Sequence, residues 1–319
     1  MDIKKVAIIC ANGIGDGLIM MTAAAYLQAQ AYLVTIFHDK FAVISKLFPA
    51  LYHWNTYSRE KIIQFNLIIV QYDGSHVSHE ILDLRLHKNF PQVIMFFPYA
   101  NSKSQSTDLI FNRSVTMIDN ILCFMQKKFP GVSHSPLSKN NILTPKKEYR
   151  KHPRRIIIHP SSANPRKNWT PVQFFLLAKK LQEFDYYPIF IVPPNESSPW
   201  KSFLAGKIPL QSFEDLVDVG DNIYESGAFI GNDSGLGHLA SSLHIPTLTI
   251  FSKPSLSPLW DPGFGIYKVL VPYNLPNYKG ISLRIREWVW PLSISTKKVL
   301  TKFFLLMKEY NQTVNKTNL

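Results

Sequence analysis

The most informative stretch of the chain reads Gly231-Asn232-Asp233-Ser234-Gly235-Leu236-Gly237-His238. It lies between the apolar run Ala228–Ile230 and the helix-like segment Leu239–Leu243. An acid, a hydroxyl, three glycines and an imidazole make a poor core, whereas the unpaired backbone N–H groups at the start of a helix readily bind an anion. The stretch therefore predicts a strand-to-helix turn of an α/β domain, shaped to hold a diphosphate.

Apolar runs alternate with helical segments along the rest of the chain. The runs are Val6–Ala11, Tyr32–Phe37, Leu67–Tyr72 and Val93–Phe97, then Arg155–His159, Ile189–Val192, Ala228–Ile230 and Thr247–Phe251. Runs without polar alternation are typical of parallel strands covered by helices on both faces. We predict an α/β fold of two Rossmann-like, doubly wound domains that face a central cleft, with ligands at the carboxyl ends of the strands.

The domain boundary is predicted near residue 150. A length of 319 residues suits two domains, and the segment Pro130–Pro153 is rich in Pro, Ser, Lys and Asn without a convincing strand. This gives domains of 1–150 and 151–319. Near the end, Lys297–Tyr310 is predicted as a basic amphipathic helix that can pack back on the N-terminal domain, followed by a disordered tail, Asn311–Leu319.

The composition narrows the possible partners. The net charge is +13 with 46% hydrophobic residues, which fits a folded protein whose partner is nucleic acid, an anionic membrane or a phosphorylated substrate, or one with a solvated basic surface. No run approaches the roughly 20 apolar residues of a transmembrane helix. We therefore expect a cytoplasmic protein, at most peripheral at the inner membrane. The two cysteines, Cys10 and Cys123, are expected to be buried thiols.

A glycine-rich turn follows the first predicted strand and reads Gly13-Ile14-Gly15-Asp16-Gly17. It lacks the lysine and hydroxyl ending of a Walker loop, and the third glycine of a dinucleotide fingerprint would fall at Leu18. What remains is a carboxylate, Asp16, at a loop–helix junction. It either caps the helix or acts as a general base toward an acceptor hydroxyl.

The second domain offers further polar side chains at strand ends. Arg166 and Lys167 lie in the loop Ser161–Trp169 and either neutralise a diphosphate leaving group or are simply solvated. His238 is either a ligand-binding or a structural histidine. Glu196, which follows a strand and two prolines, can accept hydrogen bonds from a ribose diol or be a surface glutamate. Because no cluster has metal-ligand spacing, we expect no metal ion.

Taken together, these pieces resemble glycosyltransferase family 9, the bacterial ADP-heptose:lipopolysaccharide heptosyltransferases. Four regions carry the resemblance and span nearly the whole chain in the family's order. They are Gly15-Asp16, His159–Trp169, Pro193–Glu196, and Gly231–His238 continuing through Leu239-Ala240 to Ile245-Pro246-Thr247.

The resemblance implies a GT-B architecture, with the acceptor bound by the first domain and the nucleotide-sugar by the second. It implies that Asp16 is the base of an inverting transfer that displaces ADP without a metal ion or cofactor, with Gly13, Gly15 and Arg166 in the loops toward the acceptor. The implied donor contacts are Ser161, Ser162 and Lys167 for phosphate, Glu196 for ribose, Leu210 and Gln211 for adenine, and Asp233, Ser234, Gly235 and His238 for sugar and diphosphate.

This chain departs from the family pattern in places. Ala23 stands where the family often has Pro, Ser234 replaces the commoner Thr, and Ser252 replaces a usual Gly. The loop Lys253–Gly265, with Trp260 and Asp261, has no clear counterpart, so the sequence leaves the identity of the transferred sugar open.

The function predicted is transfer of a heptose or related sugar from an ADP-sugar to a phosphorylated lipopolysaccharide core acceptor, with weak contact to an anionic membrane surface. Two alternatives remain. A non-enzymatic nucleotide-sugar or nucleic-acid binding protein would not need Asp16, and nucleic-acid binding would require clustered Arg and aromatics, of which only isolated cases such as 284–288 occur. A nucleotide-sugar epimerase would need more titratable groups in the cleft.

Overall fold

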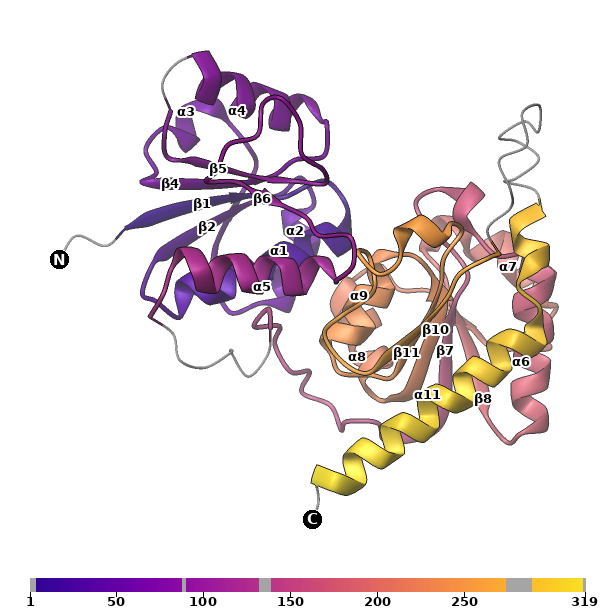
Figure 1. Cartoon of the computed structure of the whole chain (residues 1–319). Helices are drawn as coiled ribbons and strands as arrows, with labels where there is room; N and C mark the ends of the chain where they lie inside the picture. The colour runs from indigo at the N-terminus through magenta and orange to yellow at the C-terminus, as the bar shows by residue number, and fades with distance from the viewer. Residues whose placement is uncertain (1–3, 88–89, 132–138, 274–288, 318–319) are drawn as a thin grey trace, which may run out of the picture. The chain divides into compact units, whose positions relative to one another are not determined.

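The chain forms two compact α/β units, Met1–Leu143 and Thr144–Leu319. The computed structural model describes residues 4–87, 90–131, 139–273 and 289–317 (Figure 1). Each unit contains one six-stranded sheet, and all of the strand pairs described are parallel. No helix within the described ranges is long and apolar enough to cross a membrane.

The first unit has strand order β3-β2-β1-β4-β5-β6. Its strands are β1 (Lys5–Ile9), β2 (Leu33–Phe37), β3 (His53–Asn55), β4 (Leu67–Gln71), β5 (Val93–Phe97) and β6 (Leu109–Ile110). Its helices are α1 (Ile14–Gln28), α2 (Phe41–Ile44), α3 (Arg59–Ile62), α4 (His76–His87) and α5 (Met117–Lys128), with a 3₁₀ turn at Ser45–Leu47.

Both faces of this first sheet are covered, which explains the unbroken apolar runs. Figure 1 shows α3 and α4 on one face and α1 and α5 on the other. Ile9, Val70 and Met95 join one buried cluster with side chains of α3 and α4. Phe96 points the other way, because its ring packs edge-on against Phe124 of α5 at 5.4 Å between centroids.

The second unit has strand order β12-β11-β10-β7-β8-β9. Its strands are β7 (His152–His159), β8 (Tyr187–Ile191), β9 (Leu210–Gln211), β10 (Ser226–Asn232), β11 (Thr247–Ile250) and β12 (Tyr267–Leu270). Its helices are α6 (Pro171–Glu183), α7 (Ser197–Leu204), α8 (Leu216–Tyr224), α9 (Gly235–Ser242) and α11 (Thr296–Thr317), with 3₁₀ turns at Pro165–Lys167, Pro194–Glu196, Pro254–Leu256 and Trp290–Ser293.

The direction of winding reverses once in each sheet, between β1 and β4 and between β7 and β10. Loops that leave adjacent strands at such a point run to opposite sides, and open α/β sheets bind ligands in the crevice left between them. Asp16 follows β1, and Asp233 follows β10. The topology thus places one predicted polar turn at the reversal point of each unit.

The C-terminal helix is longer than expected. Helix α11 continues to Thr317, so the prediction of disorder from Asn311 onward is wrong for the residues up to Thr317. Val299, Phe303 and Leu306 of this helix are buried in the core of the second unit, and its packing on the N-terminal domain stays a prediction. An amphipathic helix with this much apolar surface is stabilised by that burial, which extends helix formation into the polar tail.

Smaller features were also missed or misplaced. The short strands β3, β6, β9 and β12 were not predicted. Cys10 is buried as expected, but Cys123 is exposed, because it lies on the outer side of α5. Thr170 is the N-cap of α6, since its side chain accepts a hydrogen bond from the N–H of Gln173. The basic segment 284–288 lies outside the described residues.

Replacement of Gly227 by Ala should destabilise the second unit. Strand β10 shifts register against β7 between Ser226 and Ala228, and a Cβ on Gly227 would collide with the backbone carbonyl of Pro153. Because neither backbone can move freely inside a sheet, we expect a loss of about 1–3 kcal/mol in urea unfolding. Gly237→Ala is the matched control, because its Cβ would meet its nearest neighbour, the Thr249 hydroxyl, at an ordinary 3.5 Å. Equal stability of the two variants would contradict this explanation.

Candidate active site

Asp16 lies in the first turn of α1, directly after β1. Gly13 is the N-cap residue and contributes no side-chain hydrogen bond. The Asp16 carboxylate instead accepts hydrogen bonds from the backbone N–H of Gly13 and from its own N–H, as an acid at the third helical position does in a capping box. Asp16 therefore does cap the helix, which was one of the two roles considered from the sequence.

Gln71, at the end of the adjacent strand β4, also binds this carboxylate. Its Nε2 donates to Oδ1 of Asp16 at 2.6 Å, and its Oε1 accepts a hydrogen bond from the N–H of Ala11 at 3.1 Å. Gln71 was not identified from the sequence, because a single glutamine at a strand end carries no signal. Only the parallel pairing of β1 with β4 brings it to Asp16.

The basicity of Asp16 follows from its surroundings. Burial, together with the nearby negative charge of Asp73, raises the pKa of the Asp16 carboxyl to about 6, although the hydrogen bonds from Gln71 and the backbone lower it. A carboxylate with a pKa near the working pH is a better proton acceptor than an ordinary aspartate and is still ionised at neutral pH. The second role considered for Asp16, that of a general base, is therefore chemically reasonable here.

His38, which follows β2, hydrogen-bonds the turn that carries Asp16. Its Nδ1 accepts a hydrogen bond from the N–H of Lys40 at 2.9 Å, so the proton is on Nε2, which donates to the carbonyl of Gly13 at 3.1 Å. Burial lowers the pKa of this imidazole, which favours the neutral ring. The His38 ring also lies close to Gly17, where an added Cβ would come within 3.1 Å of it. His38 was likewise not identified from the sequence.

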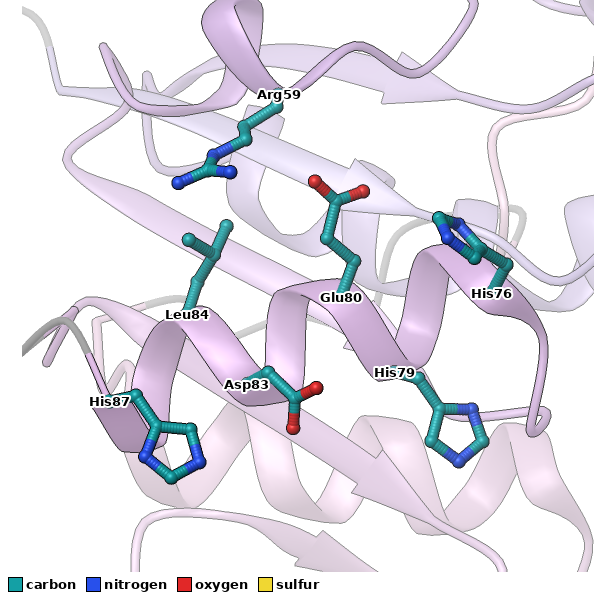
Figure 2. A pocket seen from close by; sticks show the side chains of 7 residues that line it. All are labelled: Arg59, His76, His79, Glu80, Asp83, Leu84 and His87. Carbon is teal, nitrogen blue, oxygen red and sulfur yellow. The ribbon is translucent and has the colours of Figure 1, made fainter.

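Among the described residues of the first unit, one pocket lies beside the Asp16 turn and another lies along α4. One, of about 190 Å³, is bordered by Asn12 and His38 beside the Asp16 turn, with Asp39, Tyr57 and Asp73 among its other lining residues. The other, of about 410 Å³, follows the outer side of α4 (Figure 2). Its lining residues are Arg59, His76, His79, Glu80, Asp83, Leu84 and His87. Of these two pockets, the smaller one borders the turn that carries Asp16.

In the second unit, two of the predicted donor residues contact each other. Ser161 follows β7 and Glu196 follows β8, and the Ser161 hydroxyl donates a short hydrogen bond to the Glu196 carboxylate. Ser162, the neighbouring hydroxyl, binds the side-chain oxygen of Asn168 at 2.6 Å. The structure therefore brings Ser161 and Glu196 together at the carboxyl edge of the sheet and directs Ser162 into its own loop.

Lys167 forms an ion pair with Asp233. Its Nζ lies 3.2 Å from Oδ2 of Asp233, and 40% of the lysine side chain is exposed. Arg166 is exposed, and its backbone carbonyl accepts a hydrogen bond from the indole of Trp290. Lys167 and Asp233 thus lie side by side at the ends of β7 and β10, where a phosphate could bind to the lysine.

Asn232 fixes the loop that carries Lys167. It is fully buried at the end of β10. Its Nδ2 donates to the carbonyl of Pro160 at 2.6 Å, and its Oδ1 accepts from the N–H of Trp169 at 2.9 Å. The side chain thereby holds both ends of the loop 160–169 against the strand before Asp233. Asn232 lies inside the most informative stretch of the sequence. Its role could not be predicted there, because its hydrogen-bond partners lie 72 and 63 residues away.

His238 lies inside α9 and is almost completely buried. It hydrogen-bonds the carbonyl of Pro262, and burial lowers the pKa of its ring. A bond to a carbonyl places the proton on the bonded nitrogen. Nδ1 has no hydrogen-bond partner among the described residues, so it can accept a hydrogen bond from a ligand.

Several other buried polar atoms of the second unit have no hydrogen-bond partner within the described ranges. At the carboxyl edge of the sheet and on the elements that follow it these atoms are Gln211 Oε1, Ser212 Oγ, Ser234 Oγ, Thr249 Oγ1 and Asp261 Oδ1. Buried polar atoms are rarely left unpaired, so a concentration of them marks groups available to a ligand. Leu210 and Gln211 form β9, which pairs with the end of β8. Gly235 begins α9.

Asp261 lies in the loop that had no clear counterpart in the family pattern. It is buried, and burial together with the charge of Asp233 raises the pKa of its carboxyl to about 6. The predicted residues therefore fall into two groups. Gly13, Gly15 and Asp16 belong to the first unit, and all the others belong to the second.

A family model of glycosyltransferase family 9 (heptosyltransferase) matches residues 94–262. The chain belongs to this family. A search of curated proteins found no match.

Solved structures of the family share the fold. The glycosyl transferase family 9 protein from Veillonella parvula superposes with a TM-score of 0.69 at 16% identity, covering 97% of this chain and 98% of that one. The ADP-heptose lps heptosyltransferase II of E. coli gives 0.67 at 16% identity, with 96% and 99% covered. E. coli heptosyltransferase WaaC with ADP gives 0.65 at 13%, with 95% and 99% covered. The predictions of family membership, of a glycosyltransferase and of a GT-B fold with two Rossmann-like domains are confirmed.

Replacement of Gly13 by Ala should displace the Asp16 carboxylate. A Cβ at Gly13 would overlap Oδ2 of Asp16, and the flexible partner in that contact is the acid itself. We therefore expect glycosyl transfer to fall by about 10²-fold, as for a misplaced catalytic group, with little change in the melting temperature. Gly74→Ala is the control, because a Cβ there would meet nothing within 4 Å, although its φ of +76° is strained for alanine. Full activity of Gly13→Ala would show that the position of this carboxylate does not matter.

Proposed function

We propose that this family 9 glycosyltransferase is an inverting enzyme that moves a heptose, or a related sugar, from an ADP-sugar to a lipopolysaccharide core acceptor. The observation that carries the proposal is Asp16, a carboxylate at the reversal point of the first sheet with a pKa raised to about 6 by burial. In the proposed reaction, Asp16 takes the proton of an acceptor hydroxyl as its oxygen bonds to the anomeric carbon. The bond from that carbon to the diphosphate breaks on the opposite face, and ADP leaves with the electron pair.

The donor assignment rests on the second unit. WaaC of E. coli has been solved with ADP and with ADP-2-deoxy-2-fluoro heptose. In this chain, the Ser234 hydroxyl and His238 Nδ1 have no partner in the part of the chain that the structure describes, and they are suited to hydroxyls or phosphate oxygens of such a donor. Gly235 begins α9, so its backbone N–H is free to bind an anion. In the proposal, Asp233 accepts hydrogen bonds from sugar hydroxyls, Glu196 with Ser161 binds the ribose, and the backbone of Leu210 and Gln211 in β9 contacts adenine.

Positive charge for the leaving group comes from the loop 160–169. A departing diphosphate develops negative charge, which a fixed cation stabilises. Lys167 is held at that edge by Asp233, and Arg166 and the Ser162 hydroxyl lie in the same loop. With these groups the proposed mechanism requires neither a metal ion nor a cofactor.

Any membrane contact would be electrostatic. Val299, Phe303 and Leu306 of α11 are buried in the core of the second unit, so this apolar face cannot insert into lipid. Leu305, on the same helix, is half exposed. Lys297, Lys298 and Lys308 are exposed on the same helix. Basic side chains near an anionic leaflet each contribute on the order of 1 kcal/mol to membrane binding. An enzyme bound at this surface could reach a phosphorylated acceptor embedded in the leaflet.

The central test is Asp16→Asn with ADP-heptose and truncated core acceptors, followed by ADP release. Loss of the base should lower the rate roughly 10²–10⁴-fold. The wild-type enzyme should lose kcat/KM as the pH falls through about 6, since protonated Asp16 cannot accept a proton. Full activity of Asp16→Asn would remove Asp16 as the base. An absence of ADP release from any ADP-sugar would exclude the donor.

The surface contact is tested separately with vesicles. At low salt, the protein should sediment with vesicles that contain an anionic lipid and not with zwitterionic ones, and 0.5 M salt should release it because the Debye length then falls to roughly 4–5 Å. The double variant Lys297→Glu/Lys308→Glu should bind less, while Lys127→Glu/Lys128→Glu on α5 serves as the charge-matched control. Equal binding to both lipids would exclude the contact and leave the enzymatic proposal untouched.

A further inference from the structure

We propose that Gln71 is the positioning residue for the general base: its side chain links the Asp16 carboxylate to the backbone of the turn after β1 and so fixes the direction in which the base accepts a proton. The inference rests on the proposed role of Asp16.

The orientation of the Gln71 amide is determined by its surroundings. The backbone N–H of Ala11 can only donate, so the Gln71 atom that faces it at 3.1 Å must be the oxygen. The NH₂ group then faces Asp16, where Nε2 lies 2.6 Å from Oδ1. Gln71 is itself buried, with 5% of its surface exposed. Neither end of the side chain can rotate without leaving a buried polar group unpaired, which is costly.

The Asp16 carboxylate is consequently held on both sides. Oδ1 accepts from Gln71, and Oδ2 lies so close to Gly13 that only glycine leaves room for it. The carboxylate held in this way has a single orientation. Asp16 lies in α1, whereas the amide of Gln71 comes from strand β4. A base that is oriented before the acceptor binds loses less entropy on the way to the transition state.

An amide is also the right chemical type for this task. A lysine or arginine in its place would orient the carboxylate but would lower its pKa and weaken the base. The titratable groups around the turn leave it basic, since Asp73 raises the pKa of Asp16, while burial raises the pKa of the Cys10 thiol and lowers that of His38, which keeps both neutral. Gln71 therefore supplies direction without supplying charge.

The first experiment compares Gln71→Leu with Asn120→Leu. Asn120, on α5, is a buried amide of the same unit. It donates hydrogen bonds to the carbonyls of Thr116 and Asn112 at 2.8 and 2.9 Å. Both variants lose amide hydrogen bonds and should lower the melting temperature. Only Gln71→Leu should lower kcat with ADP-heptose and truncated core acceptors, by about 10- to 100-fold. The KM for ADP-heptose should not change. Only Gln71→Leu should move the acid limb of the pH–rate profile to higher pH.

A second measurement needs no substrate. Because the pKa of Asp16 is raised from 3.8 to about 6, the folded protein binds more protons than the unfolded chain between these values. Wild type should therefore lose stability relative to Asp16→Asn as the pH rises from about 4 to 6. In the Gln71→Leu background, loss of the hydrogen bond to the carboxylate should extend this loss to higher pH. With Gln71→Glu, two carboxylates share one site, and the extension should be larger.

These outcomes separate the inference from the proposed function. If Asp16→Asn is inactive and Gln71→Leu behaves like Asn120→Leu in kcat and pH profile, the positioning role is overturned while the base is kept. If Asp16→Asn is fully active, the base is lost, and the melting curves alone decide whether Gln71 controls this carboxylate. If the stability of Gln71→Leu depends on pH in the same way as that of wild type, Gln71 does not control the Asp16 carboxylate, and the inference is overturned.

Discussion

Parallel strand pairing is the constraint on which the polar turns of each unit depend. In a parallel sheet every strand ends at the same edge, so loops from distant parts of the chain meet there. Asp16 follows β1 and Gln71 ends β4, two strands that are paired directly. Ser161, Glu196 and Asp233 follow β7, β8 and β10 in the same way. The hydrogen bonds described at each edge form only when the strand register is correct, so the chemistry depends on the ladder beneath it.

The raised pKa of Asp16 carries a cost for the fold. A pKa raised from 3.8 to about 6 corresponds to roughly 3 kcal/mol of destabilisation at neutral pH, at most. The hydrogen bonds from Gln71 and from the Gly13 backbone keep this cost from being larger, because they lower the pKa that burial raises. One carboxylate therefore caps a helix and is kept basic, which requires glycine at position 13.

The sequence predicted the long apolar strands and the polar turns after them, because both leave local patterns. The strands β3, β6, β9 and β12 have only two to four residues, too few for a pattern, and they exist because neighbouring strands offer free edges. Gln71 and Asn232 were missed as functional residues for a related reason, since their partners lie 55 to 72 residues away. The basicity of Asp16 could not be predicted, because it depends on burial that only the packed turn creates.

The two thiols have contrasting environments. Cys10 is buried at the end of β1 and its pKa is raised, so it is a poor nucleophile, whereas Cys123 is exposed on α5. The chain has two cysteines in all. A maleimide dye should therefore attach to the native protein at one position, on the outer surface of the first domain. Such a single fluorophore would report movement of that domain during turnover without any engineered residue.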